Sequence, residues 1–158
     1  MLFTEDFLHY ILKLRLFNHA NLQTTKGDEL EVFSAGIHNS DAGPDFQNSR
    51  IRIGDTIWAG NVEIHISSSD WQKHGHTTDH AYDSVILHVV YLDDLPLILA
   101  DGRRVPTVEL KKWISAKLYN RHLNLIFGNQ VFIPCEATIG SFDSLTLHNW
   151  LIRVFVER

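Results

Sequence analysis

The amino-acid sequence indicates an α/β (α+β) protein in which helices flank a mixed β-sheet. Three stretches carry this prediction. Residues 5–17 have the apolar spacing of an amphipathic helix, residues 46–66 have the pattern of a β-hairpin, and residues 84–92 form a β-branched run typical of a strand covered on both faces. Local antiparallel pairing combined with one central strand favours a mixed sheet over an all-β barrel.

The first helix is expected to begin after Thr4, because a threonine hydroxyl suits an N-cap and the acids Glu5 and Asp6 suit the positive first turn. A short strand is predicted around residues 30–33, after a turn. The later elements are predicted in this order: strands 46–53 and 57–66 around Gly54-Asp55, one helical turn at 78–82, the central strand, two strands around Asp101-Gly102, and helical patterns within residues 110–123 and 141–158.

Composition restricts the class of protein. The chain has 158 residues, a formal net charge of −5 and one cysteine, Cys135. A single cysteine excludes an internal disulfide and a multi-cysteine zinc site, and it fits a reducing cytoplasm, which is the expected location. The longest apolar run near the start is interrupted by His9, Lys13 and Arg15, so no membrane association is expected.

Two polar side chains occupy one face of the second hairpin strand. Side chains alternate along a strand, so Glu63 and His65 point away from the core face formed by Val62 and Ile64. A buried carboxylate is costly unless it is paired or bound to a ligand. The pattern therefore marks this face of the hairpin as a candidate site.

The position of Asp45, which precedes the first hairpin strand, depends on the turn. A strict two-residue turn at Gly54-Asp55 pairs Asp45 with Ile64, on the opposite face from Glu63. A three-residue loop, or a bulge at Gly60, brings Asp45 beside Glu63 instead. The sequence leaves both geometries open.

Two carboxylates beside a nitrogen base are typical of a catalytic site that binds a divalent metal ion. Asp45 and Glu63 would hold Mg²⁺ or Mn²⁺, which prefer oxygen ligands, and the ion would polarise a phosphoryl oxygen and lower the pKa of a water. His65 would position or deprotonate that water. We expect the two carboxylates to raise the pKa of His65.

The motif Pro44-Asp45 followed by Glu63-Ile64-His65 resembles that of the PD-(D/E)XK nuclease superfamily, with His65 in place of the usual lysine. The resemblance implies a restriction-endonuclease-like αβββαβ core and a metal-dependent phosphodiesterase acting on DNA or RNA, with Asp45, Glu63 and His65 as its catalytic residues. A non-catalytic module that keeps the same fold and binds nucleic acid or a protein is the alternative.

Further residues are candidates for the same site or for another. Glu5 would add a helix-borne acid, and Asp41 lies in the turn before the hairpin. His88 interrupts the central apolar run, where it would be a hydrogen-bonded core histidine or would face Glu63 from the neighbouring strand. Residues 74–80, "HGHTTDH", hold His74, His76 and Asp79, and a small metal-dependent hydrolase using these three is a second alternative, since imidazoles and a carboxylate suit Zn²⁺.

Basic side chains gather after residue 100. The first 100 residues carry 14 acidic and 6 basic side chains, whereas the remainder carries 5 acidic and 8 basic ones. Arg103, Arg104, Lys111 and Lys112 are the expected contacts to nucleic acid.

Residues 38–91 contain blocks, among them "HNSDAGPDF" and "SDWQKHGHTTDHAYDSVILHVVY", that are similar to the N-terminal part of a bacterial family of unknown function. We expect a PD-(D/E)XK-like domain over residues 1–135, and the start of a C-terminal helical region over 136–158 of a longer protein. The last helix carries Trp150, Leu151 and Phe155 on one apolar face, so it is expected to pack on the missing sequence or on a second protomer of a homodimer, or to be poorly ordered.

Overall fold

The computed structural model describes residues 4–99, 101–128 and 140–156. The chain divides into two compact units, residues 1–115 and residues 116–158. The domain boundary expected at residues 135 and 136 lies outside the described residues. Within the described ranges, no helix has the length and apolar character that a membrane crossing requires.

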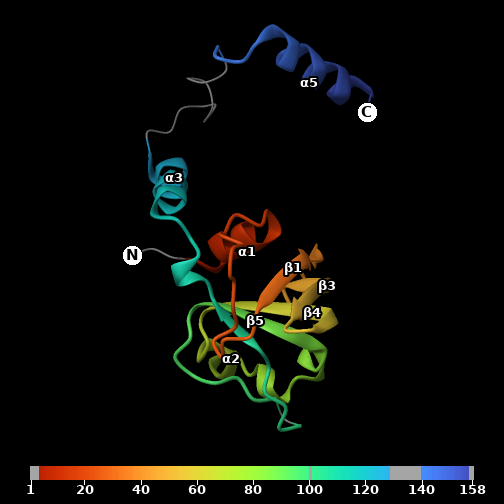
Figure 1. The fold of residues 1–158 in the computed structure, drawn as a ribbon, viewed down its shortest axis with the longest axis vertical. Coiled ribbons are helices and arrows are strands. Elements are labelled where there is room, and N and C mark those ends of the chain that lie inside the picture. The colour runs from red at the N-terminus through yellow and green to blue at the C-terminus, as the bar shows by residue number, and fades with distance from the viewer. Residues whose placement is uncertain (1–3, 100, 129–139, 157–158) are drawn as a thin grey trace. The chain divides into compact units, whose positions relative to one another are not determined.

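A six-stranded mixed sheet forms the centre of the first unit (Figure 1). The strands lie in the order β1-β3-β4-β5-β6, and the short β2 pairs with β3. Pairs among β1 to β4 are antiparallel, whereas β5 runs parallel to both β4 and β6. The bounds are β1 Leu30–Ser34, β2 Ile37–His38, β3 Phe46–Ile53, β4 Thr56–Ser67, β5 Val85–Leu92 and β6 Thr107–Glu109.

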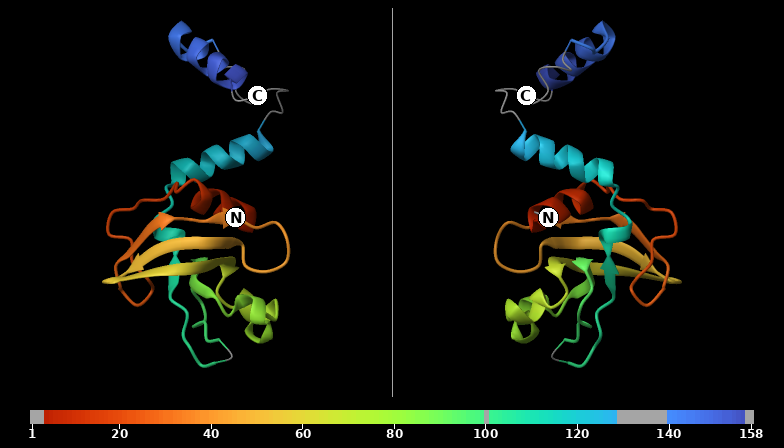
Figure 2. Two further views of the ribbon diagram at one scale, coloured as in Figure 1. Left: turned by 90° about the vertical axis from the view of Figure 1, so that its right-hand side faces the viewer. Right: turned by 90° about the vertical axis from the view of Figure 1, so that its left-hand side faces the viewer.

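Helical segments cover the two faces of this sheet. Figure 2 shows α1 on one side and the segment from α2 to η2 on the other. The bounds are α1 Glu5–Lys13, α2 Asp70–Lys73, and the 3-10 turns η1 His76–Thr78, η2 His80–Tyr82 and η3 Leu110–Lys112. The sequence α1, β1, β3, β4, α2, β5 follows the expected αβββαβ order, and the predicted α/β fold is confirmed.

The predicted first helix and central strand are both present. Thr4 caps α1 by accepting a hydrogen bond from the Phe7 N–H at 3.4 Å, and α1 buries Phe7, Leu8 and Ile11. All residues of β5 from Val85 to Val90 are buried, as expected for a strand covered on both faces.

The hairpin of β3 and β4 has a two-residue turn, and its β-bulge lies within β3. Ile53 pairs with Thr56 across Gly54-Asp55, and the register shifts by one residue between Ser49 and Phe46. This bulge lies in β3 at Asn48, whose φ is +58°, a left-handed conformation that asparagine tolerates better than most residues. The bulge is therefore not at Gly60, the position considered from the sequence.

Gly60 has a different role, which is to allow β4 and β5 to approach each other closely. A Cβ at this position would lie 2.5 Å from the Ile86 side chain and 2.8 Å from the Ser84 carbonyl oxygen. Only glycine fits there without movement of a neighbour.

The prediction of two strands around Asp101-Gly102 is wrong in the extent of these strands. The segment contains an isolated bridge between Ile98 and Arg104, and a strand begins only at Thr107. Pro96 and Pro106 flank the segment, and a proline has no backbone N–H to donate to a ladder.

The second unit contains α3, Ala116–Phe127, and α5, Ser144–Val156. Asp143 caps α5, because its Oδ1 accepts a hydrogen bond from the Thr146 N–H at 2.8 Å. The predicted terminal helix is thus present over residues 144–156, and its Trp150, Leu151 and Phe155 are exposed.

Candidate metal centre

The site is built on two neighbouring parallel strands. Glu63 and His65 come from β4, and His88 of β5 lies beside Glu63 in the strand register. The three side chains are buried, with exposed fractions of 5%, 1% and 0% respectively. Buried ionisable groups on adjacent strands need partners, and the surrounding loops supply them.

Asp45 and Glu63 lie side by side because of the bulge at Asn48. Phe46 pairs with Val62, so the residue before Phe46 lies next to Glu63. The Asp45 N–H donates a hydrogen bond to Glu63 Oε2 at 3.1 Å, and Asp45 Oδ2 accepts one from the Ile64 N–H at 2.8 Å. Each carboxylate thus has one oxygen fixed by the opposite strand.

The remaining oxygens of these two carboxylates face histidines. Asp45 Oδ1 lies 3.3 Å from Nε2 of His9, on α1. Glu63 Oε1 lies 3.7 Å from Nε2 of His65 and 3.5 Å from Nε2 of His76, in η1. A buried carboxylate oxygen is therefore surrounded by imidazole nitrogens.

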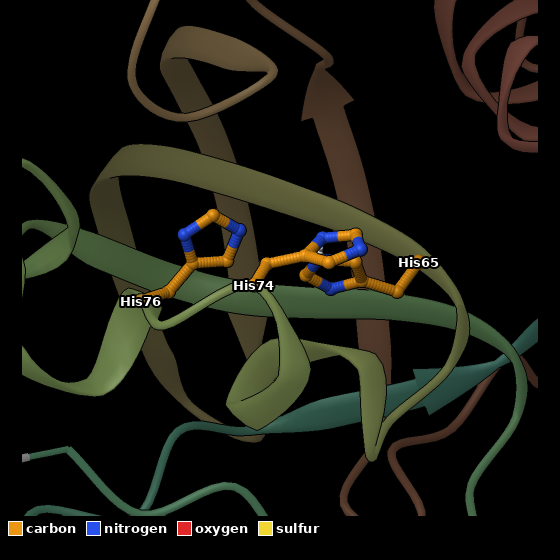
Figure 3. Close-up of side chains that lie close together, drawn as sticks. All are labelled: His65, His74 and His76. Atoms are coloured by element: carbon orange, nitrogen blue, oxygen red, sulfur yellow. Dashed lines mark hydrogen bonds between the residues drawn. The ribbon is translucent and has the colours of Figure 1, made fainter.

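His65 lies between two other imidazoles. Its Nδ1 is 2.8 Å from Nε2 of His88, and its Nε2 is 3.1 Å from Nδ1 of His74, the residue that ends α2. Figure 3 shows the His65 and His74 rings together, with His76 beside them. Gly75, at a φ of +77°, turns the chain between His74 and His76.

Two aromatic side chains fix the histidine rings. The Tyr82 ring stacks on that of His76, with centroids 3.9 Å apart and planes inclined by 27°. Trp71 is fully buried and presents an edge-on contact to the rings of His65, His76 and His88. The loop after β4 therefore holds its histidines against the sheet by packing.

Burial favours the neutral forms of Glu63, His65 and His88 in the metal-free site. Burial, and secondarily the charge of Asp45, raise the pKa of Glu63 to about 9. Burial, and then the neighbouring His88 and His74, lower the pKa of His65 to about 3, and burial also lowers that of His88 to about 3. The expectation that the carboxylates raise the pKa of His65 is wrong, because burial of the ring and the neighbouring imidazoles lower it.

This arrangement suits a cation. Neutral imidazoles have a free lone pair for a metal. A divalent ion would offset the burial of the Glu63 carboxylate and favour its ionised form. The residues present thus match the needs of a bound metal in both ligand type and charge.

The structure joins residues that the sequence suggested for two different sites. Asp45, Glu63 and His65 lie together with His74, His76 and His88. Glu5, at the start of α1, lies near this group, since burial raises its pKa and the charges of His74 and Asp45 also act on it.

Asp41 and Asp79 have other contacts. The Asp41 N–H donates to Asn39 Oδ1 in an exposed turn. Asp79 caps η2, where its Oδ1 accepts a hydrogen bond from the Ala81 N–H at 2.9 Å. The structure does not bring either carboxylate into contact with Glu63.

The basic residues proposed as nucleic-acid contacts do not form one patch. Arg103 donates to the Asp83 carbonyl just before β5, and Arg104 forms the bridge to Ile98. Lys111 lies over the Tyr91 ring near the end of β5, and Lys112 lines a cavity with Asp93 and Glu109. The length of β5, about 26 Å for eight residues at about 3.3 Å per residue, separates the arginine pair from the lysine pair.

Sequence reasoning missed His9 as a member of the site. It was visible as a histidine that interrupts the apolar run of the first helix. Its partner could not be inferred without the position of α1 over β4. The combination of His74 and His76 with Glu63 was missed for the same reason, because it depends on how the loop after β4 folds back onto that strand.

One family model, described as a protein of unknown function (DUF2851), matches residues 5–158. The chain belongs to the DUF2851 family. This match confirms the expected membership of a family of unknown function. The DUF2851 chain matches no curated protein and no solved structure.

Proposed function

We propose that this DUF2851 protein is a metal-dependent phosphodiesterase that acts on nucleic acid. The observation that carries the proposal is the adjacency of Asp45 and Glu63, each bonded to the backbone of the other's strand. The position of Pro44-Asp45 before β3 and of Glu63 on β4, in an αβββαβ order, agrees with the PD-(D/E)XK resemblance.

The chemistry assigned to the residues follows from their contacts. Asp45 and Glu63 would hold Mg²⁺ or Mn²⁺, which supplies a Lewis acid for the phosphoryl oxygen and lowers the pKa of a water. Burial lowers the pKa of His65 to about 3, which makes its imidazole a weak base, so His65 would act as a metal ligand inside the site. His9, whose Nε2 is 3.3 Å from Asp45 and whose side chain is partly exposed, is the imidazole placed to accept a proton.

A cleavage assay tests the proposal. Purified protein is incubated with single-stranded DNA, duplex DNA and RNA in the presence of Mg²⁺ or Mn²⁺. We expect cleavage that is lost in Asp45→Asn and Glu63→Gln. Asp41→Asn is the matched control, because Asp41 lies in the same segment but in an exposed turn. Binding without cleavage of any of these polymers by the wild-type protein would favour the non-catalytic module instead.

A further inference from the structure

We infer that His65, His74 and His76, which Figure 3 shows close together, form with Glu63 a four-ligand site for a transition-metal ion of the zinc type. The inference shares Glu63 with the proposed phosphodiesterase centre, but it adds three nitrogen ligands and names a different class of ion. It does not depend on the protein being an enzyme, so it can be tested without turnover.

Three distances between the candidate ligand atoms are close to those expected around a tetrahedral ion. One nitrogen of each histidine lies within 4.8 Å of the others. The closest separations are 3.1 Å for His65 to His74, 3.7 Å for His65 to Glu63 Oε1, and 3.5 Å for His76 to Glu63 Oε1. Zinc bonds of about 2.0–2.1 Å in tetrahedral geometry place ligand atoms about 3.3–3.4 Å apart. These three separations bracket this value, and the remaining histidine pairs lie within 4.8 Å.

The protonation pattern of His65 also fits a ligand. A neutral imidazole has one N–H, so His65 can donate at only one of its two nitrogens. When Nδ1 donates to His88 Nε2, which is 2.8 Å away, the lone pair of Nε2 is free. In the metal-free protein, a hydrogen bond between His65 Nε2 and His74 Nδ1 needs a proton on one of these two nitrogens. A bound metal ion would take the place of that proton. His88 is in this way the partner that fixes the ligand's tautomer.

The ligand types select the class of metal. Three imidazoles and one carboxylate suit Zn²⁺, Co²⁺ and similar ions, whereas Mg²⁺ prefers oxygen ligands and retained waters. Glu63 supplies the single negative charge among the four, and a dication relieves the desolvation of its carboxylate.

The elements that carry the ligands are held in place by hydrogen bonds and packing. Asp70 at the start of α2 accepts a hydrogen bond from the Ser67 N–H at 2.9 Å, which ties α2 to the end of β4. Asp94 accepts from the Ser69 N–H at 2.8 Å. The stack of Tyr82 on His76 fixes the third imidazole. A site with ligands already placed loses little free energy to ordering when the ion binds.

Cobalt titration of the full chain tests the site directly. Protein treated with EDTA and then dialysed is titrated with Co²⁺, which absorbs strongly in the visible range when it is four-coordinate, and Zn²⁺ is then added to displace it. We expect one equivalent with this absorption. Loss of an outer-shell partner lowers metal affinity by about 10–100-fold. His74→Ala and His76→Ala each remove a ligand, so each should lower the affinity for Co²⁺ by more than this.

His80→Ala is the matched control for these two variants. His80 lies in the same loop, but its side chain is 95% exposed and pairs with Asp83. We expect His80→Ala to bind Co²⁺ as the wild-type protein does. Circular dichroism of the metal-free variants shows whether each one is folded.

The outcomes separate this inference from the proposed function. Tight cobalt binding that survives Asp45→Asn, without nucleic-acid cleavage under any metal, supports the inference and contradicts the phosphodiesterase proposal. Metal binding lost in Asp45→Asn and retained in His74→Ala and His76→Ala overturns the inference and leaves that proposal standing. Absence of any cobalt or zinc binding by folded wild-type protein also overturns it, and the histidines are then a hydrogen-bonded core cluster.

Discussion

The backbone N–H of Asp45 donates a hydrogen bond to the Glu63 carboxylate, and the Asp45 carboxylate in turn accepts one from the residue after Glu63. The two acids thus fix each other across β3 and β4. A one-residue bulge at Asn48 creates this adjacency, because without it Asp45 would pair with Ile64 and face the other way. The site therefore depends on a backbone irregularity three residues from its first carboxylate.

The first prediction concerns Asn48, whose φ is +58°. Asn48→Val should destabilise the protein by at least about 1–2 kcal/mol, since a β-branched residue is strained in the left-handed region. Asn48→Gly should leave stability within about 0.5 kcal/mol, because glycine adopts this conformation freely. Urea unfolding at pH 7 measures both. Equal stabilities for the two variants would show that the bulge does not need this φ.

The sequence predicted those parts of the fold that depend on local patterns. The alternation along residues 57–66 and the apolar run at 85–90 indicated the hairpin and the central strand, and both are present. The position of the bulge was not predictable in the same way, since Asn48 and Gly60 both carry the local signals of an irregularity. The segment before Thr107 was predicted wrongly because its prolines oppose strand pairing more than the turn at Asp101-Gly102 favours it.

The candidate site was predictable only in pieces. Strand alternation was enough to place Glu63 and His65 on one face. His74 and His76 reach them through a left-handed turn at Gly75 and a stack on Tyr82, which no spacing rule gives. The sign of the His65 pKa shift was missed because it depends on burial by Trp71 and the loop, which is a tertiary property.

The second prediction is that the metal-free protein is most stable near pH 6.5. His65 and His88 have folded pKa values of about 3, below the usual 6.5, so their unfolded forms bind more protons and stability rises from pH 3 to 6.5. The folded pKa of Glu63 is about 9, above its usual 4.5, so its contribution is lost as the pH rises from 4.5 to 9. The two histidines outweigh Glu63 below pH 6.5, and only Glu63 acts above it.

Urea unfolding in EDTA at pH 5, 6.5 and 8.5 measures this profile. Between pH 6.5 and 8.5 the free energy of unfolding should fall by at most about 1.4 kcal/mol per pH unit, the limit for one proton. Glu63→Gln removes the titrating group and should flatten that limb. A wild-type profile that is flat above pH 6.5 would contradict a raised pKa for Glu63.

The third prediction is that Zn²⁺ stabilises the folded protein through the histidine site. At a free concentration 100 times the dissociation constant, an ion that binds only the folded state adds about 2.7 kcal/mol to the free energy of unfolding. The melting temperature of the wild-type protein and of His80→Ala should therefore rise with Zn²⁺, whereas that of His76→Ala should not. A rise of the same size in His76→Ala would place the stabilising ion elsewhere.

The last prediction assigns His88 a positioning role. His88 Nε2 lies 2.8 Å from His65 Nδ1, and its own Nδ1 has no hydrogen-bond partner within the described part of the chain. Its place next to His65 lets its Nε2 accept a hydrogen bond from the His65 Nδ1–H, which leaves Nε2 of His65 to the metal. His88→Ala should lower the affinity for Co²⁺ by about 10–100-fold.

Because all four ligands remain in His88→Ala, the visible spectrum at saturation should keep the wild-type shape. The apparent affinity should also become more sensitive to pH below neutrality, since the tautomer of His65 is no longer fixed. An unchanged affinity in folded His88→Ala would remove His88 from the site, and a changed spectrum would make it a ligand.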